Sequence, residues 1–237
     1  MKIEYPIRLQ SYLAKSGFGS RRGCEELILQ GRVTINAKRV KALGTKVEMD
    51  DVVYVDDELA EPADKSYYLV LNKPVGFVCT NYDPFETSYA RDLIDIPQKN
   101  LLYNVGRLDK DSSGLIIFTN DGDFANKVMH PSNEIEKEYL VKVDRLITRK
   151  DLETLKKGEI KPYQIVDYKK ETKTWVRITL FEGKNREIRK MLEALDFEVE
   201  KLIRIRIGKI EIDKLASGRY RTLTKPEVES LLKGENK

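Results

Sequence analysis

The chain has 237 residues, of which 41% are hydrophobic and 35% charged, and its formal net charge is +4 at pH 7. These values describe a globular protein with two domains, or with one domain and a small module. No apolar run approaches the roughly 18 residues that a membrane-spanning helix needs. Two cysteines, Cys24 and Cys79, and one histidine, His130, are too few for a disulfide framework, a four-cysteine metal site or a site of several imidazoles. We therefore expect buried, reduced thiols, no bound metal and a cytoplasmic protein.

The charge is unevenly distributed along the chain. Residues 1–47 hold ten Lys and Arg against three Asp and Glu, so the rest of the chain is slightly acidic. A basic terminal segment is the usual electrostatic signature of a nucleic-acid contact, although a basic surface that serves only solubility remains an alternative.

The first elements that we expect are two short helices. Leu9, Tyr12 and Leu13 would share one face of the first helix. Ser20 is a suitable N-cap for the second helix, and Gly31 is a suitable C-terminal stop.

A hairpin and a linker are predicted next. Residues 32–40 alternate around a turn at Asn36 and Ala37, and residues 47–57 read as strand-like. Residues 59–66 contain Pro and polar residues and predict a linker. The expected domains are residues 1–62 and residues 63–237.

The remaining chain predicts an α+β domain with a mixed, mainly antiparallel sheet flanked by helices. The expected strands are residues 67–71, 115–119, 138–143, 174–181 and 203–207. The expected helices are residues 123–130, 151–157, 185–195 and 225–233. In the last strand Ile203, Ile205 and Ile207 alternate with Arg204 and Arg206, which predicts one buried and one charged face.

A single acid, Asp109, occupies a polar turn directly before the apolar run Leu115–Phe118. A carboxylate on such a turn is held by the strand behind it and remains open to a cleft, although a solvated loop aspartate is the commoner case. The full string Gly106-Arg107-Leu108-Asp109 closely resembles the motif of the ribosomal RNA pseudouridine synthases of the RsuA/RluB branch. The resemblance implies that Asp109 is the catalytic nucleophile.

Two further segments resemble this family. Lys137-Glu-Tyr139 is similar to a Lys-x-Tyr strand whose tyrosine packs on the target uracil and serves as the probable base. In the segment from Gly183 to Leu192, the resemblance makes Arg189 the partner of the catalytic aspartate. A guanidinium there favours the ionised carboxylate near RNA phosphates. From helical spacing we expect Arg186, Arg189 and Lys190 on one basic face, for which a solvated surface is the alternative.

The resemblance covers nearly the whole chain in the same order. It places Ile207 in the base pocket and Arg107 in the space that a flipped base leaves. The sequence departs from the family pattern at Asn104, where proline is usual, and at Ser112, where threonine is common; both departures concern the geometry of the loop.

The N-terminal segment resembles the S-four RNA-binding module, in which a helix pair and a following loop contact RNA by shape and phosphates. The residues that we expect to contact RNA are Arg107, Arg8, Arg21, Arg22, Arg32, Lys38 and Arg39.

The resemblance thus implies an enzyme that isomerises a uridine of ribosomal RNA to pseudouridine, with base flipping and without a cofactor. Large-subunit RNA is slightly favoured, and the partner is ribosomal RNA or a ribosome assembly intermediate, bound by a monomer. Sugar-first and base-first routes both remain open. A non-catalytic RNA-binding or ribosome-assembly protein is the main alternative, and a glycosidase is a weaker one because no second acid is nominated.

Overall fold

The structure is a computed structural model that describes residues 4–80, 85–157, 164–167, 174–181 and 184–233. The chain divides into two compact units. The first unit contains Met1–Tyr67 and Pro97–Leu102, and the second contains Tyr68–Ile96 and Tyr103–Lys237. The sequence predicts a division at residue 63 and places Pro97–Leu102 in the second part. No helix among the described residues is long and apolar enough to cross a membrane.

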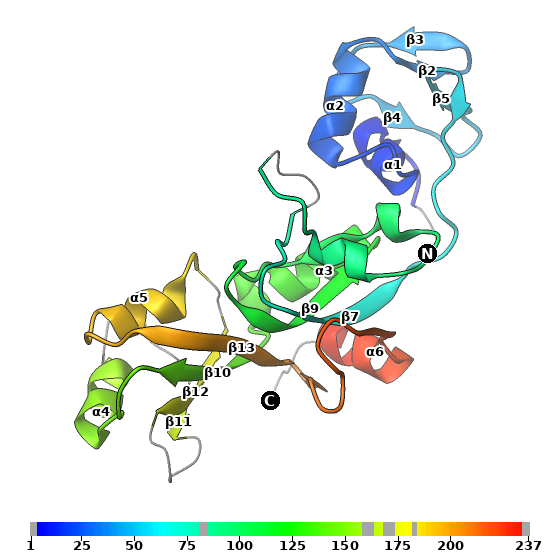
Figure 1. Ribbon diagram of the computed structural model, residues 1–237. Helices are drawn as coiled ribbons and strands as arrows, with labels where there is room; N and C mark the ends of the chain where they lie inside the picture. Colours follow the sequence, from blue (N-terminus) through cyan, green and yellow to red (C-terminus); the bar gives the residue numbers. More distant parts are fainter. Residues whose placement is uncertain (1–3, 81–84, 158–163, 168–173, 182–183, 234–237) are drawn as a thin grey trace. The chain divides into compact units, whose positions relative to one another are not determined.

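The first unit combines two helices with two small sheets (Figure 1). The helices are α1 (Leu9–Lys15) and α2 (Arg21–Leu29), and a 3-10 turn, η2, covers Lys99–Leu101. The strands are β1 (Ile7–Arg8), β2 (Val33–Ile35), β3 (Lys38–Val40), β4 (Lys46–Val47), β5 (Val53–Val55) and β6 (Glu58–Leu59). β1 pairs with β4, and the other four strands form a sheet in the order β3-β2-β5-β6.

The local signals in this unit act as predicted. The Ser20 hydroxyl accepts a hydrogen bond from the Gly23 N–H at 3.1 Å, so it caps α2. Gly31 follows the helix with a φ of +70°. Asn36 and Ala37 both have positive φ, 50° and 64°, as a two-residue hairpin turn of this hand requires.

The buried core of the first unit extends into the predicted linker. Leu9, Leu13 and Ile28 from the two helices pack with Ala60, and the Tyr12 hydroxyl donates to the Ala60 carbonyl at 3.0 Å. The predicted linker at residues 59–66 therefore starts too early, because Ala60 still belongs to this core.

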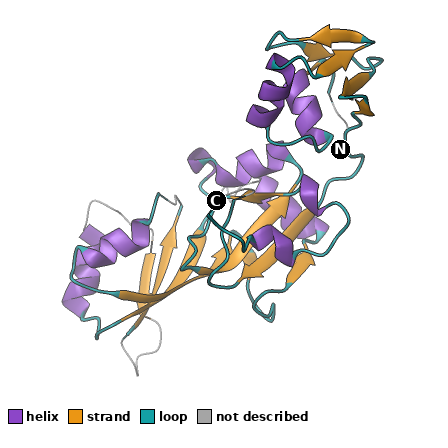
Figure 2. Cartoon of the chain, turned by 45° about the horizontal axis from the view of Figure 1, so that its top comes forward, coloured by secondary structure: helices purple, strands orange, loops and turns teal. Residues whose placement is uncertain are grey.

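The second unit is built on one nine-stranded sheet (Figure 2). Its strand order is β11-β12-β10-β13-β9-β7-β15, with β14 paired to β13 and β8 paired to β9. The strands are β7 (Tyr68–Lys73), β8 (Tyr103–Val105), β9 (Ser113–Thr119), β10 (Lys137–Val143), β11 (Gln164–Asp167), β12 (Trp175–Leu180), β13 (Val199–Ile207), β14 (Ile210–Glu211) and β15 (Tyr220–Thr222). The strand pairs are antiparallel apart from β9 with β13. The prediction of an α+β fold with a mixed, mainly antiparallel sheet is confirmed.

Helices flank this sheet. They are α3 (Gly122–Met129), α4 (Arg149–Lys157), α5 (Glu187–Glu193) and α6 (Lys225–Lys233), with 3-10 turns η1 (Ala90–Leu93) and η3 (Pro131–Asn133). The main apolar core joins β7 and β9 to α3 and α6, and its members include Val70, Leu115, Ile117, Phe124 and Leu231. This core provides the rigid base from which the loop before β9 projects. The two cysteines are buried and unbridged, as expected.

Strand β13 departs from the predicted alternation of a buried and a charged face. Its Arg206 lies opposite Glu138 of β10, whereas Arg204 lies opposite Tyr139, so the register shifts between these two pairs. Because Glu138 and Tyr139 are adjacent on β10, they point to opposite faces, and the two arginines must do the same. The predicted single charged face is therefore wrong, since Ile205 is the extra residue of a β-bulge.

Candidate active site

The Asp109 turn, residues 106–112, links β8 to β9. Gly106 has a φ of +75°, which favours glycine at this position. The Asn104 side-chain amide donates to the Gly106 carbonyl at 2.6 Å, so the residue that replaces the family's usual proline braces the turn by a hydrogen bond. The Ser112 N–H donates to the Asp109 carbonyl at 3.0 Å. These bonds fix the backbone around the key acid.

A second loop holds this turn from the side. The Gly76 N–H donates to the Lys110 carbonyl at 2.8 Å, and the Leu108 N–H lies 3.5 Å from the Cys79 sulfur. The Lys110 ammonium also forms an ion pair with Glu86 at 2.7 Å. The turn is thus attached to the segment that follows β7.

A pocket of about 360 Å³ opens beside Asp109. Its lining residues are Val75, Gly76, Asp109, Lys110, Asp111 and Arg186. The depression is open to solvent, and the Asp109 side chain is 29% exposed. A carboxylate that is fixed by its backbone and still reachable from solvent is available for chemistry on a bound group.

The guanidinium nearest to Asp109 belongs to Arg186. Its Nη1 atom lies 3.6 Å from Asp109 Oδ2 and 3.4 Å from Asp111 Oδ2. Arg189 instead pairs with Asp111 at 3.1 Å and donates to the carbonyls of Asp111 and Val199. In the described part of the chain, the predicted pairing of Arg189 with Asp109 is therefore replaced by a pairing with Arg186.

The start of α5 explains this exchange. The helix begins at Glu187, and Arg186 precedes it in the left-handed region with φ 52° and ψ 32°. Arg189 is only 6% exposed, whereas Lys190 is exposed. The predicted basic face of Arg186, Arg189 and Lys190 is wrong, because the first residue lies outside the helix and the second lies on its buried side. The preceding residues Glu182 and Gly183 lie outside the described residues.

Tyr139 belongs to a row of four paired residues that crosses neighbouring strands of the sheet and shares one face. Lys73 on β7 faces Gly114 on β9, Gly114 faces Arg204 on β13, and Arg204 faces Tyr139 on β10. Residues directly opposite one another on paired strands share a face, and neighbouring strands lie about 4.8 Å apart. Tyr139 is 7% exposed and does not line the pocket beside Asp109.

Lys73, which is buried in this row, and Lys137, which is half-buried on β10, both have lowered pKa values. The Lys73 ammonium donates to the carbonyls of Pro74 and Phe77 at 2.9 and 2.8 Å. Burial lowers the pKa of Lys73, while the negative charges of Asp111 and Asp109 act in the opposite direction. Burial and the charge of Arg204 lower the pKa of Lys137 to about 8.

Sequence reasoning assigned no role to Lys73, Lys137 or Arg204. The first two stand in segments that resemble the family, Asn-Lys-Pro and Lys-x-Tyr, so their positions were available as a signal. No comparable signal distinguishes Arg204 from Arg206.

Ile207 is a core residue. It is 2% exposed and packs with Leu115, Ile117 and Leu231 in the main apolar cluster. Its predicted place in the base pocket is therefore corrected, because its side chain helps to hold α6 against the sheet.

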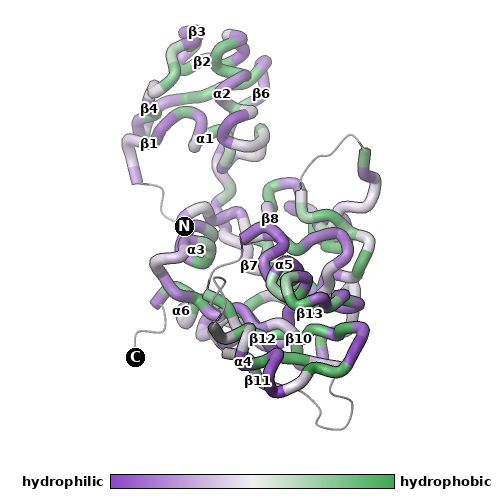
Figure 3. Tube along the Cα trace, turned by 90° about the vertical axis from the view of Figure 1, so that its left-hand side faces the viewer, coloured by the Kyte–Doolittle hydropathy of each residue, from purple (hydrophilic) through white to green (hydrophobic). Residues whose placement is uncertain are grey.

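The residues predicted to contact RNA are exposed. Arg107 is exposed two residues before Asp109 in the second unit. Six others are exposed in the first unit, namely Arg8, Arg21, Arg22, Arg32, Lys38 and Arg39. Figure 3 shows β3, which carries two of these cations, as largely hydrophilic and β2 as largely hydrophobic. Arg32 forms an ion pair with Asp56, so part of its charge is already matched within the unit. Among the described residues, no group of three His, Cys, Asp or Glu side chains is placed to hold a metal ion.

Comparison with known proteins extends over almost all of the chain. The family model of RNA pseudouridylate synthases matches residues 67–194, and that of the S4 domain matches residues 7–53. The dual-specificity RNA pseudouridine synthase RluF of Escherichia coli (strain K12) is 40% identical over 96% of this chain and 79% of that protein. The ribosomal large subunit pseudouridine synthase B of Bacillus subtilis (strain 168) is 39% identical over 94% of this chain and 95% of that protein. A crystal structure of a pseudouridylate synthase covers 95% of this chain and 99% of its own, with a TM-score of 0.65 and 28% identity.

Proposed function

The chain belongs to the RNA pseudouridylate synthase family, and from this premise we propose that it converts one uridine of ribosomal RNA to pseudouridine with Asp109 as the nucleophile. The pairing of Asp109 with Arg186 at the pocket is the observation that carries this assignment. The guanidinium places a positive charge beside the carboxylate that is proposed to react.

The proposed division of labour is between two domains along the chain. An S4 domain in residues 1–62 binds RNA through its exposed cations, and a catalytic domain in residues 63–237 carries the reaction. Contacts of the first kind hold a folded RNA by its phosphates and do not read its sequence. Large-subunit ribosomal RNA is the favoured substrate, because the similar Bacillus subtilis protein carries that subunit in its name.

The proposed mechanism begins with a uridine that leaves its RNA helix and enters the site, at a cost of a few kcal/mol. Arg107, exposed beside the key acid, occupies the vacated stacking space. Asp109 then starts cleavage of the glycosidic bond, either by attack on the ribose or by removal of a ribose proton. The detached uracil turns on the ring of Tyr139 and rejoins the ribose through carbon, which returns Asp109 to its free carboxylate form. The tyrosine hydroxyl relays the proton that this carbon loses, and the uracil nitrogen freed by the cleavage gains one proton in exchange.

The two arginines take different parts in this proposal. Arg186 is the partner of the reacting carboxylate, since it reaches Asp109 from the pocket wall. Arg189 fixes the end of the turn, since it binds both the carboxylate and the carbonyl of Asp111. No step needs a redox or energy input, so side chains alone are sufficient.

The decisive experiment combines cells and purified protein. Pseudouridines are mapped in ribosomal RNA from cells with and without the gene, and the purified protein is then assayed on free RNA and on assembling subunits. Asp109→Asn should abolish product and leave RNA affinity within about threefold, because it removes the nucleophile and keeps the shape of the turn. Asp123→Asn, an exposed acid on α3, serves as the matched control and should retain full turnover.

Two results would reject the proposal. Turnover by Asp109→Asn at the wild-type rate would remove Asp109 from the reaction. An unchanged pseudouridine map in cells without the gene, with RNA binding intact, would favour a non-catalytic RNA-binding protein.

A further inference from the structure

Arg204 is a buried arginine to which the proposed mechanism assigns no role. It is 3% exposed, and among the ion pairs of the described residues none joins it to a carboxylate. A buried charge without an opposite charge destabilises a fold by several kcal/mol, so its presence here calls for a role other than stability.

The side chain of Arg204 contacts the start of the Asp109 turn and the strand β9 that follows it. Its Nε atom donates to the Leu115 carbonyl at 2.6 Å, and its Nη1 atom lies 3.5 Å from the Arg107 carbonyl. Arg107 precedes Asp109 by two residues, and Leu115 follows the turn on β9. One planar guanidinium therefore binds the backbone before and after the reacting carboxylate, which a lysine ammonium cannot do with the same geometry.

The backbone of Arg204 lies between β9, which follows the Asp109 turn, and β10, which carries Tyr139. It lies opposite Gly114 on one side and opposite Tyr139 on the other. A Cβ atom on Gly114 would lie 2.2 Å from the Arg204 carbonyl oxygen, so β9 and β13 approach as closely as backbones can. Arg204 is thus a residue of β13 that contacts both the start of β9, next to the Asp109 turn, and the strand that carries Tyr139.

We propose that Arg204 is a positioning residue that sets the separation between Asp109 and Tyr139. This inference rests on the proposed function, because the separation matters only if both side chains act on the same uridine. A displacement of about 1 Å between reacting groups lowers a rate about 100-fold, even when the substrate still binds. The loss should therefore appear in the chemical step and spare RNA affinity.

Arg206 provides a matched control on the same strand. It has the same side chain, and the bulge at Ile205 turns it to the other face, where it pairs with Glu138 and Glu136 at 2.7 and 2.8 Å. Removal of either arginine disturbs β13, but only Arg204 contacts the Asp109 turn. The comparison separates positioning from general support of the strand.

The experiment compares Arg204→Lys and Arg204→Gln with Arg206→Lys and Arg206→Gln in the full chain. It measures the single-turnover rate of pseudouridine formation, the RNA dissociation constant and the melting temperature. We expect Arg204→Lys to lower the rate about 10- to 100-fold at an unchanged dissociation constant. Arg204→Gln should lower it further, so that lysine restores part of the rate that glutamine loses. The Arg206 variants should melt earlier and react at the wild-type rate while folded.

Three results would overturn the proposal. The first is a folded Arg204→Lys variant that reacts at the wild-type rate. The second is an Arg204 variant that loses RNA affinity but keeps the single-turnover rate. The third is a rate loss in the Arg206 variants equal to that in the Arg204 variants. If Arg204→Gln does not fold, the folded lysine variant decides. A wild-type protein that forms no pseudouridine would instead reject the proposed function, so the two failures are distinguishable.

Discussion

The exposed cations of the first unit and the buried cations of the second unit have different settings. In the first unit Arg21, Arg22 and Arg39 are exposed, whereas in the second unit Lys73, Arg189 and Arg204 are buried. Exposed cations attract phosphates over a distance that salt screens, and their exact geometry matters little. Buried cations hold specific carbonyls and carboxylates at fixed distances. We therefore expect that substitutions of exposed cations change RNA affinity, whereas substitutions of buried cations change the alignment of the reacting groups.

The largest effect is expected where the backbone of β9 meets the buried Arg204. Gly114→Ala places a Cβ atom 2.2 Å from the Arg204 carbonyl oxygen at a residue with a φ of +106°. We expect a loss of stability of about 3 kcal/mol and a rate at least about 100-fold lower, measured by thermal unfolding and single turnover. Gly218→Ala is the control, because its φ of +76° is also positive and the space around it is open. Equal behaviour of the two variants would contradict the close approach of β9 and β13.

A smaller effect is expected at Arg186, whose side chain is 41% exposed and contacts Asp109. Arg186→Gln removes the charge beside Asp109, and we expect a rate about 10- to 30-fold lower in single-turnover assays at saturating enzyme. Lys190→Gln removes a charge from the exposed side of α5 and should leave this rate unchanged. A similar loss in both variants would mean that general charge, and not contact with Asp109, is responsible.

The contribution of exposed cations to RNA binding is tested in α2. The double variant Arg21→Gln with Arg22→Gln should weaken RNA binding about 5- to 10-fold at 0.1 M salt, because two phosphate contacts are lost. The slope of log affinity against log salt should become shallower by about 2, and the rate at saturation should not change. The double variant Arg149→Gln with Lys150→Gln on α4 removes the same charge. If it weakens binding equally, the first unit has no special share in RNA affinity.

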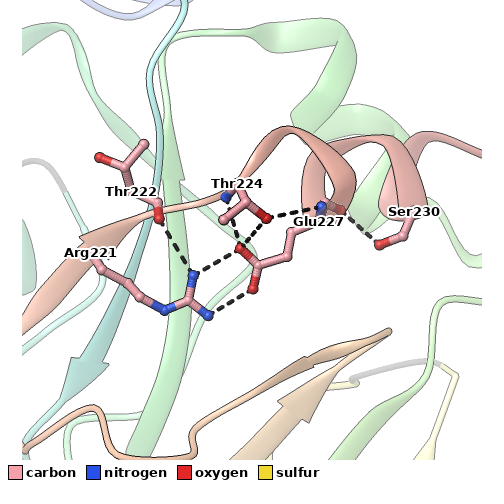
Figure 4. A network of polar contacts seen from close by, with 5 residues as sticks. All are labelled: Arg221, Thr222, Thr224, Glu227 and Ser230. Carbon is pink, nitrogen blue, oxygen red and sulfur yellow. Dashed lines mark hydrogen bonds and ion pairs between the residues drawn. The ribbon is translucent and has the colours of Figure 1, made fainter.

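The smallest effect concerns stability alone. The Nη2 and Nη1 atoms of Arg221 donate hydrogen bonds to the Glu227 carboxylate at 2.7 and 2.8 Å. This carboxylate also accepts a hydrogen bond from the Thr224 N–H at 2.8 Å (Figure 4). The hydrogen bonds from Arg221 lower the pKa of Glu227 to about 2. Because this value lies below that of an unfolded glutamate, the stabilisation is complete above about pH 4.5 and is lost as the pH falls toward 2.

The expected outcome for Glu227→Gln is a free energy of unfolding lower by about 1–2 kcal/mol at pH 7, with the difference from wild type vanishing near pH 2. Denaturant titrations at several pH values measure this, and the reaction rate serves as an internal check because it should not change. Glu229→Gln is the control, since its pair with Lys233 is exposed and 3.8 Å long. A pH-independent loss would rule out the charged form of Glu227 as its source.

The features that sequence predicts well here are local. The cap at Ser20 and the turn at Asn36 and Ala37 both depend on residues within a few positions of one another. Their hydrogen bonds form whatever the rest of the chain does, so sequence spacing is sufficient.

The features that sequence misses depend on distant contacts. Helical spacing placed Arg186 and Arg189 on one exposed face, but Asp111 draws Arg189 into the interior. Strict alternation put Arg204 and Arg206 on one face, but the bulge in the pairing of β13 with β10 separates them. Neither Asp111 nor β10 is near these residues in sequence, so no local pattern reports the outcome. The pairing of Arg189 with Asp109 came from the family resemblance, and in the structure Arg186 lies beside Asp109 while Arg189 pairs with Asp111.

The place of β13 in the sheet has a consequence for synthesis of the protein. The strand lies between β10 and β9 although it is translated after both, and β10 and β9 do not pair with each other. Long-range pairing of this kind forms late, because it must await the chain that completes it. A nascent chain that ends before residue 199 therefore holds its aspartate and its tyrosine on unjoined segments.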